Sequence, residues 1–289
     1  MKIMVKVASE GGSEVEIAST ALGKIGILTI PIMIQVENQS FLHIGASPSP
    51  LTEKKGAVFK VDRTPVIPAS SFKGALRNQI ELLLSTEVDT LGKVFNLPED
   101  HKTLLKPCIP DSRPSEAERD LIQAKRYRST HCEVKIGERK EPVSDAGLCP
   151  VCYFMGAAGI MGCVRVSNFF PKAQQGTILV DQTNIRLDRK TGTAVNKAKV
   201  DSEQVKPGTQ FTGSLEIVEF TPIGFEFGNS RTIAGKVLDP WINAWQEKDV
   251  NTRKKILLER ILIPALQNIS MLGGQKSKGG GKVLVTVPV

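Results

Sequence analysis

An alternating apolar run between Lys24 and Glu37 is the feature that most restricts how this chain can fold. Its apolar members are Ile25, Ile27, Leu28, Ile30, Ile32, Ile34 and Val36. Successive side chains of a strand point to opposite faces, so this spacing predicts a long β-strand with one buried face. We expect it to be the first core strand of the fold.

A helix is predicted after the long loop that follows this strand. Residues 40–61 contain the glycines and prolines typical of a loop, and a loop of that length is usually functional. Ser70 or Ser71 is then placed as an N-cap ahead of apolar residues spaced three and four apart. Lys73 and Arg77 lie one turn apart near the start of this helix, close enough to act together.

The C-terminal part of the chain predicts a second helix and a closing strand. Asn251 or Thr252 opens an apolar periodic segment that is expected to kink near Pro264 and to end at glycines 273–274. Residues 282–287 read as a short strand. Strand, loop and helix early, then helix, glycine loop and strand late, predict an α+β fold with a βαββαβ, ferredoxin-like core.

Charge and composition favour a polyanionic partner. The 289 residues include 38 Lys and Arg against 30 Asp and Glu, which gives a formal charge of +8 and a pI of about 9.2. Aromatic residues make up only 5%, so we expect backbone and charge contacts to dominate over base stacking. The chain shows neither a long apolar span nor a signal peptide, and a cytoplasmic protein is expected.

A glycine-rich segment at residues 273–282 holds five glycines and three lysines. Such a loop lets backbone amides approach phosphates while lysines supply charge. It departs from the phosphate-binding loop of nucleotide hydrolases in spacing and in following a helix, and the alternative is a flexible turn. Its candidate RNA-binding residues are Gly273, Gly274, Lys276, Lys278, Gly279 and Gly280.

The five cysteines, an odd number, do not read as a disulfide framework. Cys149 and Cys152 form a C-x-x-C knuckle that can share a metal, and tetrahedral zinc is the natural candidate. Three upstream residues can complete it: His131, Cys132 and Cys108, two of the three being needed. The alternative is reduced cysteines in a core, the assignment we give Cys163. The polar residues 93–141 predict an insertion outside the core.

Four segments, in order, resemble the RAMP superfamily. Ile67–Arg77 (IPASSFKGALR) is similar to its IPGSSLKGALR signature, and Gly162–Asn168 (GCVRVSN) to its GRVRVSD strand. Arg186–Gly192 (RLDRKTG) resembles the segment that opens the family's thumb hairpin, and residues 273–282 resemble its C-terminal glycine-rich loop. Among RAMP proteins, the pattern is most similar to the repeated backbone subunits of type III CRISPR effectors.

This resemblance implies a guide RNA-binding subunit of a type III CRISPR interference complex. It implies one RAMP domain over residues 1–289 with a modified RNA-recognition core, a zinc-knuckle insertion at about 93–155 and a β-hairpin thumb at about 181–235. The expected partners are crRNA, target RNA, other subunits of the complex and head-to-tail copies of the chain. The residues expected at the RNA are Ser70, Ser71, Lys73, Arg77, Arg186, Arg189 and Lys190, together with the glycine loop.

Catalysis is the open question. Target-cleaving relatives use an aspartate in the loop after the first strand, but residues 43–50 contain no acid. Asp62 is the nearest aspartate, so it is the candidate catalytic residue for Mg²⁺-dependent cleavage of target RNA. His43 can act as a general base or be structural. Two alternatives are a RAMP endoribonuclease that processes precursor crRNA and a zinc-containing ribosomal or tRNA-binding protein.

Overall fold

The computed structural model describes residues 2–6, 14–22, 25–46, 56–110, 113–135, 147–172, 176–222, 224–247 and 249–287. At residues 2–6, 14–22 and 196–200 only the backbone is described. The predicted loop at 43–50 is therefore described only as far as Ala46.

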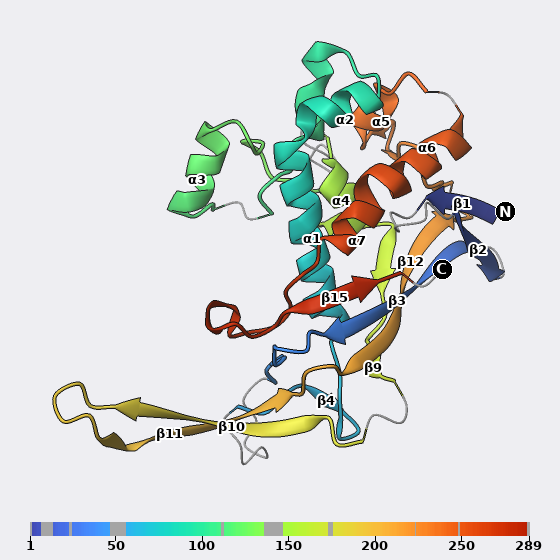
Figure 1. Cartoon of the computed structure of the whole chain (residues 1–289). Helices are drawn as coiled ribbons and strands as arrows, with labels where there is room; N and C mark the ends of the chain where they lie inside the picture. Colours follow the sequence, from blue (N-terminus) through green and yellow to red (C-terminus); the bar gives the residue numbers. More distant parts are fainter. Residues whose placement is uncertain are drawn as a thin grey trace.

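A twisted antiparallel sheet forms the body of the protein (Figure 1). The predicted strand is its centre, β3 (Ile25–Val36), and its even-numbered residues from Leu28 to Val36 are buried. Its neighbours in the sheet are β1 (Lys2–Lys6), β2 (Glu14–Leu22), β8 (Val164–Val166), β9 (Phe170–Pro171), β12 (Gln210–Phe220) and β15 (Val283–Thr286). Strand β3 is the first of the buried centre, although β1 and β2 precede it.

The connections of the sheet place two helical stretches on the same face. Strands β15, β3, β12 and β8 lie side by side in that order, and each pair is antiparallel. Helix α1 (Ala69–Thr86) lies between β3 and β8 in the chain, and a second helical stretch lies between β12 and β15. The two helices contact each other above the buried face of the sheet (Figure 1). The α+β prediction is confirmed.

Helix α1 buries one face, as its spacing predicts. Its buried residues are Phe72, Leu76, Ile80 and Leu84. The ring of Phe72 packs against that of Phe169, with centroids 4.6 Å apart. The predicted serine N-cap is wrong: Pro68 is the N-cap, and its side chain makes no cap hydrogen bond. Instead Asn168 Oδ1 accepts from the Ala69 N–H at 2.9 Å, so a residue distant in sequence satisfies the first turn.

The second helical stretch is interrupted where the kink is predicted. It consists of α6 (Val250–Leu257), a π-helical turn (Leu258–Leu262) and α7 (Ile263–Gln267). Pro264 follows the π turn, which fits its inability to donate a backbone hydrogen bond. The helix start is Asp249 rather than Asn251 or Thr252, because the Asp249 carboxylate accepts from both of their N–H groups.

The described part of residues 88–155 contains short helices, of which α2 and α4 contact α1. They are α2 (Val88–Val94), a 3₁₀ helix (Glu99–Leu105), α3 (Glu116–Gln123) and α4 (Pro150–Met155). The expectation that residues 93–141 lie outside the core is wrong in part. Leu105 and Cys108 are fully buried and belong to the main apolar cluster, although α3 buries no residue. Isolated apolar residues in a polar sequence conceal this packing.

Smaller elements complete the described chain. The remaining helices are α5 (Pro240–Asn243) and a 3₁₀ turn (Lys276–Lys278). The short strand pairs are β4 (Lys60–Val61) with β5 (Thr64–Pro65), β6 (Gly156–Ala157) with β7 (Ile160–Met161), and β13 (Thr232–Ile233) with β14 (Lys236–Val237). Among the described helices, none is long and apolar enough to cross a bilayer.

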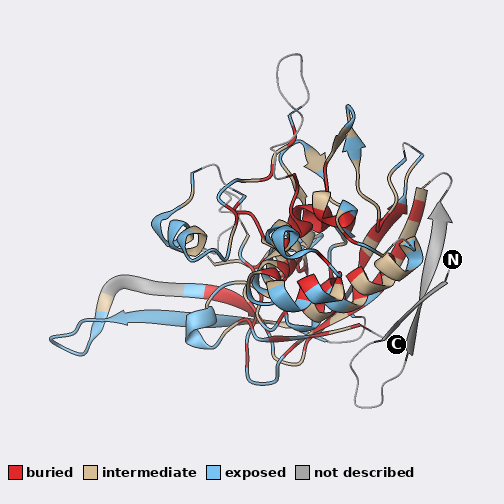
Figure 2. Cartoon of the chain, turned by 90° about the horizontal axis from the view of Figure 1, so that it is seen from above, coloured by how far each residue is buried: buried red, intermediate tan, exposed pale blue. Residues whose placement is uncertain are grey.

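A long hairpin extends from the body, as the polar stretch around residues 188–206 predicts. Strand β10 (Leu179–Leu187) pairs with β11 (Ala194–Val205) from Leu179 and Val205 outward. The outer part of the hairpin is exposed, whereas residues 202–205 at its base are buried (Figures 1 and 2). Within the range 181–235, this hairpin is distinct from β12, which belongs to the main sheet.

Candidate metal centre and nucleic-acid interface

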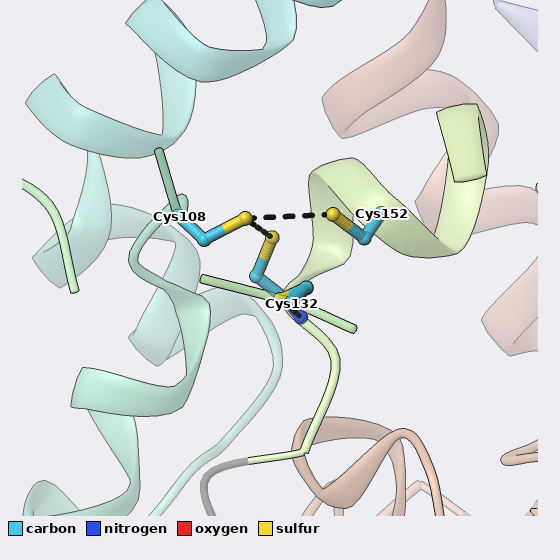
Figure 3. Close-up of side chains that lie close together, drawn as sticks. Cys108, Cys132 and Cys152 are labelled. Carbon is cyan, nitrogen blue, oxygen red and sulfur yellow. Dashed lines mark hydrogen bonds between the residues drawn. The ribbon is translucent and has the colours of Figure 1, made fainter. Parts of the chain in front are cut away.

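Four cysteines meet in the interior beside α1 and α4. Cys108, Cys132, Cys149 and Cys152 are all buried, and their Sγ atoms lie within 4.8 Å of one another. Cys108 Sγ is 3.5 Å from Cys152 Sγ and 3.7 Å from Cys149 Sγ (Figure 3 labels three of the four). All four are free thiols, since a disulfide requires sulfurs about 2.05 Å apart.

This cluster has the dimensions of a tetrahedral zinc site. Zinc–sulfur bonds of about 2.3 Å place the sulfurs of a regular tetrahedron about 3.8 Å apart, close to the two separations above. The donor set also suits zinc, which readily takes four thiolates in structural sites. The residues therefore fit a structural zinc ion, and Cys108 rather than His131 is the fourth donor.

Other metal ligands are not assembled in the part of the chain that the structure describes. His131 Nε2 lies 3.3 Å from a carboxylate oxygen of Glu133, outside the sulfur cluster. Within the described ranges, the four cysteines are the only group of three or more potential ligands that converge on one point. Asp62 belongs to no such group, so its expected role with Mg²⁺ has no support from neighbouring carboxylates.

The local fold brings the knuckle and its upstream partners together. Cys149 is the N-cap of α4, Pro150 is its first residue, and Cys152 lies within its first turn. The backbone N–H of Cys149 donates to Cys132 Sγ at 3.2 Å. Such N–H···S bonds orient a thiolate ligand and offset its charge.

Burial and hydrogen bonding shift the pKa values of three of the cluster thiols in different directions. Burial opposes ionisation of Cys149, but hydrogen bonds from the other three thiols and the charge of Arg128 outweigh it and lower the pKa of Cys149. Hydrogen bonds with Cys108 and other cluster thiols, together with burial, raise the pKa values of Cys132 and Cys152. Cys149 is therefore the thiol most readily ionised, and a divalent cation held by the four sulfurs would supply the charge that favours ionisation of the others.

Arg77 of the signature motif faces this cluster. Its Nε donates to Glu81 Oε1 at 2.8 Å, and its other two nitrogens approach the Gly156 carbonyl oxygen at 3.3 Å and Cys152 Sγ at 3.7 Å. Lys73, one turn earlier, has a different neighbour, the carbonyl oxygen of Val164 in β8 at 3.4 Å. Burial, then the charge of Arg77, lowers the pKa of Lys73.

The glycine-rich loop is anchored to the segment that follows β3. The Gly274 N–H donates to the His43 carbonyl oxygen at 2.8 Å, and the Gly281 N–H donates to the Phe41 carbonyl oxygen at 2.8 Å. Ser40 Oγ donates to the Gly279 carbonyl oxygen at 3.0 Å. The loop is therefore held at several points, and a flexible turn does not describe it.

The amides of this loop are mostly engaged within the protein. The N–H groups of Gly274, Lys278, Gly279, Gly280 and Gly281 all donate to protein carbonyl oxygens. Lys276 and Lys278, in contrast, have exposed side chains. The loop therefore exposes positive charge on its lysine side chains, whereas most of the backbone amides that the sequence favours for phosphate contact are engaged within the protein.

The base of the hairpin joins the glycine loop and the His43 segment into one surface. Gln204 Nε2 donates to Gln275 Oε1 at 3.1 Å, and His43 Nδ1 lies 2.8 Å from the Glu203 carbonyl oxygen. The Glu203 carboxylate in turn pairs with Lys60 Nζ at 2.8 Å. We call this assembly of residues 40–45, 202–205 and 273–282 the loop–thumb surface.

The remaining predicted residues lie on exposed turns. Asp62 and Arg63 form the tip of the β4–β5 hairpin and both have positive φ, 48° and 65°. Arg186, Arg189 and Lys190 are exposed at or near the tip of the β10–β11 hairpin. Asp188 shapes that tip by accepting hydrogen bonds from the N–H groups of residues 190 and 191.

Ser70 and Ser71 mark the start of α1, at the other side of the signature motif. Ser70 is exposed and Ser71 half-buried, while the adjacent Ala69 is capped by Asn168. The motif thus has two ends in different surroundings. Asn168, from the segment after β8, caps the backbone at its N-terminal end, and Arg77 at its C-terminal end faces the cysteine cluster.

Sequence reasoning missed three residues that organise these sites. Glu81 holds Arg77, Glu203 links Lys60 to the His43 segment, and Asn168 caps α1. Glu81 lies four residues after Arg77, a spacing that predicts an ion pair on one helix face. The other two act across long sequence separations, which periodicity and spacing cannot detect.

Comparison with known proteins supplies the family. No curated protein matches the chain. One chain of the solved structure described as "Cryo-EM structure of the Type III-B Cmr-beta bound to cognate target RNA" is similar at 13% identity and a TM-score of 0.40. The similarity covers 90% of the present chain and 59% of that longer one. The sequence profile of the RAMP superfamily matches residues 36–284, which is most of the chain, and the protein therefore belongs to the RAMP superfamily.

Proposed function

We propose that this protein is a guide RNA-binding backbone subunit of a type III CRISPR interference complex. Membership of the RAMP superfamily supports the proposal. The strand order β15-β3-β12-β8, with a helical connection on each side of the β8-to-β12 segment, supports a ferredoxin-like core of the modified RNA-recognition type. On this view residues 1–289 are one RAMP domain, carrying the cysteine-containing insertion and the β10–β11 thumb.

The loop–thumb surface is the observation that carries the proposal. It places exposed lysines, Lys276 and Lys278 among them, on a loop that the His43 segment and the thumb base hold in place. Fixed cations of this kind attract a ribose-phosphate strand without reading its bases. The chain also carries a formal charge of +8. A guide-holding subunit requires this tolerance of sequence.

The remaining assignments follow from the same proposal. Lys73, Ser70 and Ser71 are proposed as further RNA contacts, and Arg186, Arg189 and Lys190 as thumb contacts to the guide–target duplex. The proposed partners are crRNA, target RNA, other subunits of the complex and head-to-tail copies of this chain. A structural zinc ion is proposed at the four cysteines, which its donor set and dimensions support.

Salt-dependent RNA binding tests the proposal. Replacement of both Lys276 and Lys278 by alanine should weaken binding to single-stranded RNAs of unrelated sequence by similar factors. The negative slope of the logarithm of the RNA association constant against the logarithm of salt concentration should become less steep by about 1.4. Each phosphate contact to a single strand contributes about 0.7 to this slope. Lys93 and Lys106 lie on another part of the chain, and their double alanine variant, which removes the same number of positive charges, is the control. An unchanged slope in the loop variant contradicts the proposal.

A second activity, RNA cleavage, is favoured by the position of His43. A hydrogen bond to the Glu203 carbonyl oxygen requires a proton on Nδ1, which leaves Nε2 of neutral His43 as an acceptor beside the glycine loop. Target-RNA cleavage and precursor crRNA processing are both compatible with such a base. Cleavage that His43→Ala abolishes while RNA binding persists would support this role.

Asp62 provides the contrasting prediction for cleavage. Metal-dependent target cutting that depends on Asp62 should be lost in Asp62→Ala with RNA affinity unchanged. Cutting that persists in both variants would place the reaction in another subunit or at another site. Neither result bears on RNA binding, which the lysine variants test separately.

A further inference from the structure

Arg77 is surrounded by protein partners rather than directed into solvent. Its side chain is only 23% exposed, and each of its three nitrogens has a neighbour in the protein. The partners are a carboxylate, a backbone carbonyl and a sulfur. A guanidinium that approaches a phosphate through its planar fork would have to give up at least part of this arrangement.

The three partners connect α1 with the metal knuckle. Glu81 lies one turn further along α1 and holds the guanidinium from its own helix at 2.8 Å. The other two contacts, to Cys152 Sγ at 3.7 Å and to the Gly156 carbonyl oxygen at 3.3 Å, belong to α4 and the residue that ends it. Arg77 therefore bridges the long helix and the short helix that begins at Cys149 and contains Cys152.

The negative charge of a zinc-loaded cysteine cluster gives a physical reason for a cation at the position of Arg77. Four thiolates around Zn²⁺ carry a net charge of about −2, which is costly in a buried site unless cations or N–H donors offset it. Arg77 stands at Cys152. Arg128, itself buried, lies near Cys149 and donates to the carbonyl oxygen of Gly147, two residues before that cysteine. Two cations thus lie near a site whose ligands bring two excess negative charges.

We propose that Arg77 is a positioning residue of the metal centre, which orients the Cys152 sulfur and ties the knuckle to α1. This inference rests on the zinc site proposed above, and it changes the role of one residue of the signature motif. Lys73 remains the motif's candidate RNA contact, and Arg77 supports it indirectly. Zinc binding and the placement of α1 are then coupled through one side chain.

Zinc affinity measured beside RNA affinity tests the inference. We would purify the full chain and its Arg77→Gln, Arg77→Lys and Lys73→Ala variants, and compete each for zinc against a chromophoric chelator. Arg77→Gln should lose 10–100-fold in zinc affinity, the usual effect of removing a residue that supports a metal ligand. Arg77→Lys keeps the charge but not the fork, so its loss should be smaller.

RNA binding at saturating zinc separates the two roles of the motif. Zinc-loaded Arg77→Gln should bind single-stranded RNA within about twofold of the wild type and with the same salt slope. Lys73→Ala should show the opposite pattern, with normal zinc affinity and a slope reduced by about 0.7. If Arg77→Gln does not fold even with excess zinc, Arg77→Lys carries the same comparison.

The outcomes distinguish the inference from the proposal beneath it. Wild-type protein that binds no zinc in the competition defeats the metal centre, and the role of Arg77 with it. Zinc-binding wild type together with unaltered zinc affinity in the Arg77 variants overturns the inference alone. A shallower salt dependence of RNA binding in zinc-saturated Arg77→Gln would also overturn the inference, because it would show that Arg77 contacts a phosphate.

Discussion

Gly273→Ala should disrupt the loop–thumb surface far more than Gly279→Ala does. Gly273 has φ of 71°, and a Cβ there would overlap the carbonyl oxygen of His43 and lie 3.0 Å from its carbonyl carbon. Gly279 has a similar φ of 82°, yet a Cβ there would have no atom within 4 Å. The two positions share a left-handed backbone and differ in the close approach.

The difference between the two variants can be estimated from these contacts. A left-handed conformation costs an L-residue about 1–2 kcal/mol, and this term applies to both. Only Gly273→Ala must also push the loop away from His43, which breaks the 2.8 Å hydrogen bond from the Gly274 N–H. A lost hydrogen bond with a partly buried acceptor costs about 1–3 kcal/mol. We therefore expect Gly273→Ala to be about 2 kcal/mol less stable than Gly279→Ala.

Urea denaturation of the two variants and the wild type measures this difference directly. In thermal unfolding it corresponds to a separation of about 4–8 °C in Tm, given about 2–4 °C per kcal/mol for a chain of this size. RNA affinity should fall in parallel for Gly273→Ala, since Lys276 and Lys278 move with the loop. Equal losses of stability in the two variants would refute the reasoning, because the contact with His43 would then carry no weight.

Three further experiments test separate parts of the fold. Burial raises the pKa of Cys163 to about 12, so about one thiol in 10⁴ is ionised at pH 8. Iodoacetamide should therefore label Cys163 only after denaturation, and labelling of the native protein in peptide mass maps would argue against this burial. Asn168→Ala removes the acceptor of the Ala69 N–H and should cost about 1 kcal/mol in urea denaturation. Asp239 binds Arg231 through both carboxylate oxygens at 2.8 Å, so Asp239→Ala leaves a largely buried guanidinium without its ion-pair partner. The free energy of unfolding should fall by about 3–5 kcal/mol. A loss below about 1 kcal/mol would show that solvent reaches the pair.

The sequence predicted elements whose signal is local. The alternation of residues 25–36 and the spacing of the apolar residues in α1 each reflect one buried face, so the central strand and the main helix followed directly. The glycine loop and the cysteine knuckle were also recognisable, because their chemistry is concentrated in a few consecutive residues. The order of four motifs then identified the family that the sequence profile supports.

The sequence could not predict which distant groups meet. Neither the choice of Cys108 over His131 nor the capping of α1 by Asn168 has a signal within one window of residues. The surroundings of Arg77 are the most instructive case. Two of its neighbours in the protein come from α4 and the residue that ends it, so they depend on a tertiary contact that spacing does not encode.

The position of the cysteine cluster explains how a weakly apolar segment is held to the body. Helix α3 buries none of its residues and lies apart from the helices on the sheet (Figure 1). Cys108 precedes this helix and Cys132 follows it, and both sulfurs belong to the cluster. A metal bound there would attach the segment at both ends, which its own hydrophobic burial does not achieve. Metal removal should therefore loosen residues 108–132 before the main sheet, and hydrogen exchange with and without a chelator would reveal faster exchange in α3 than in β3 or β12.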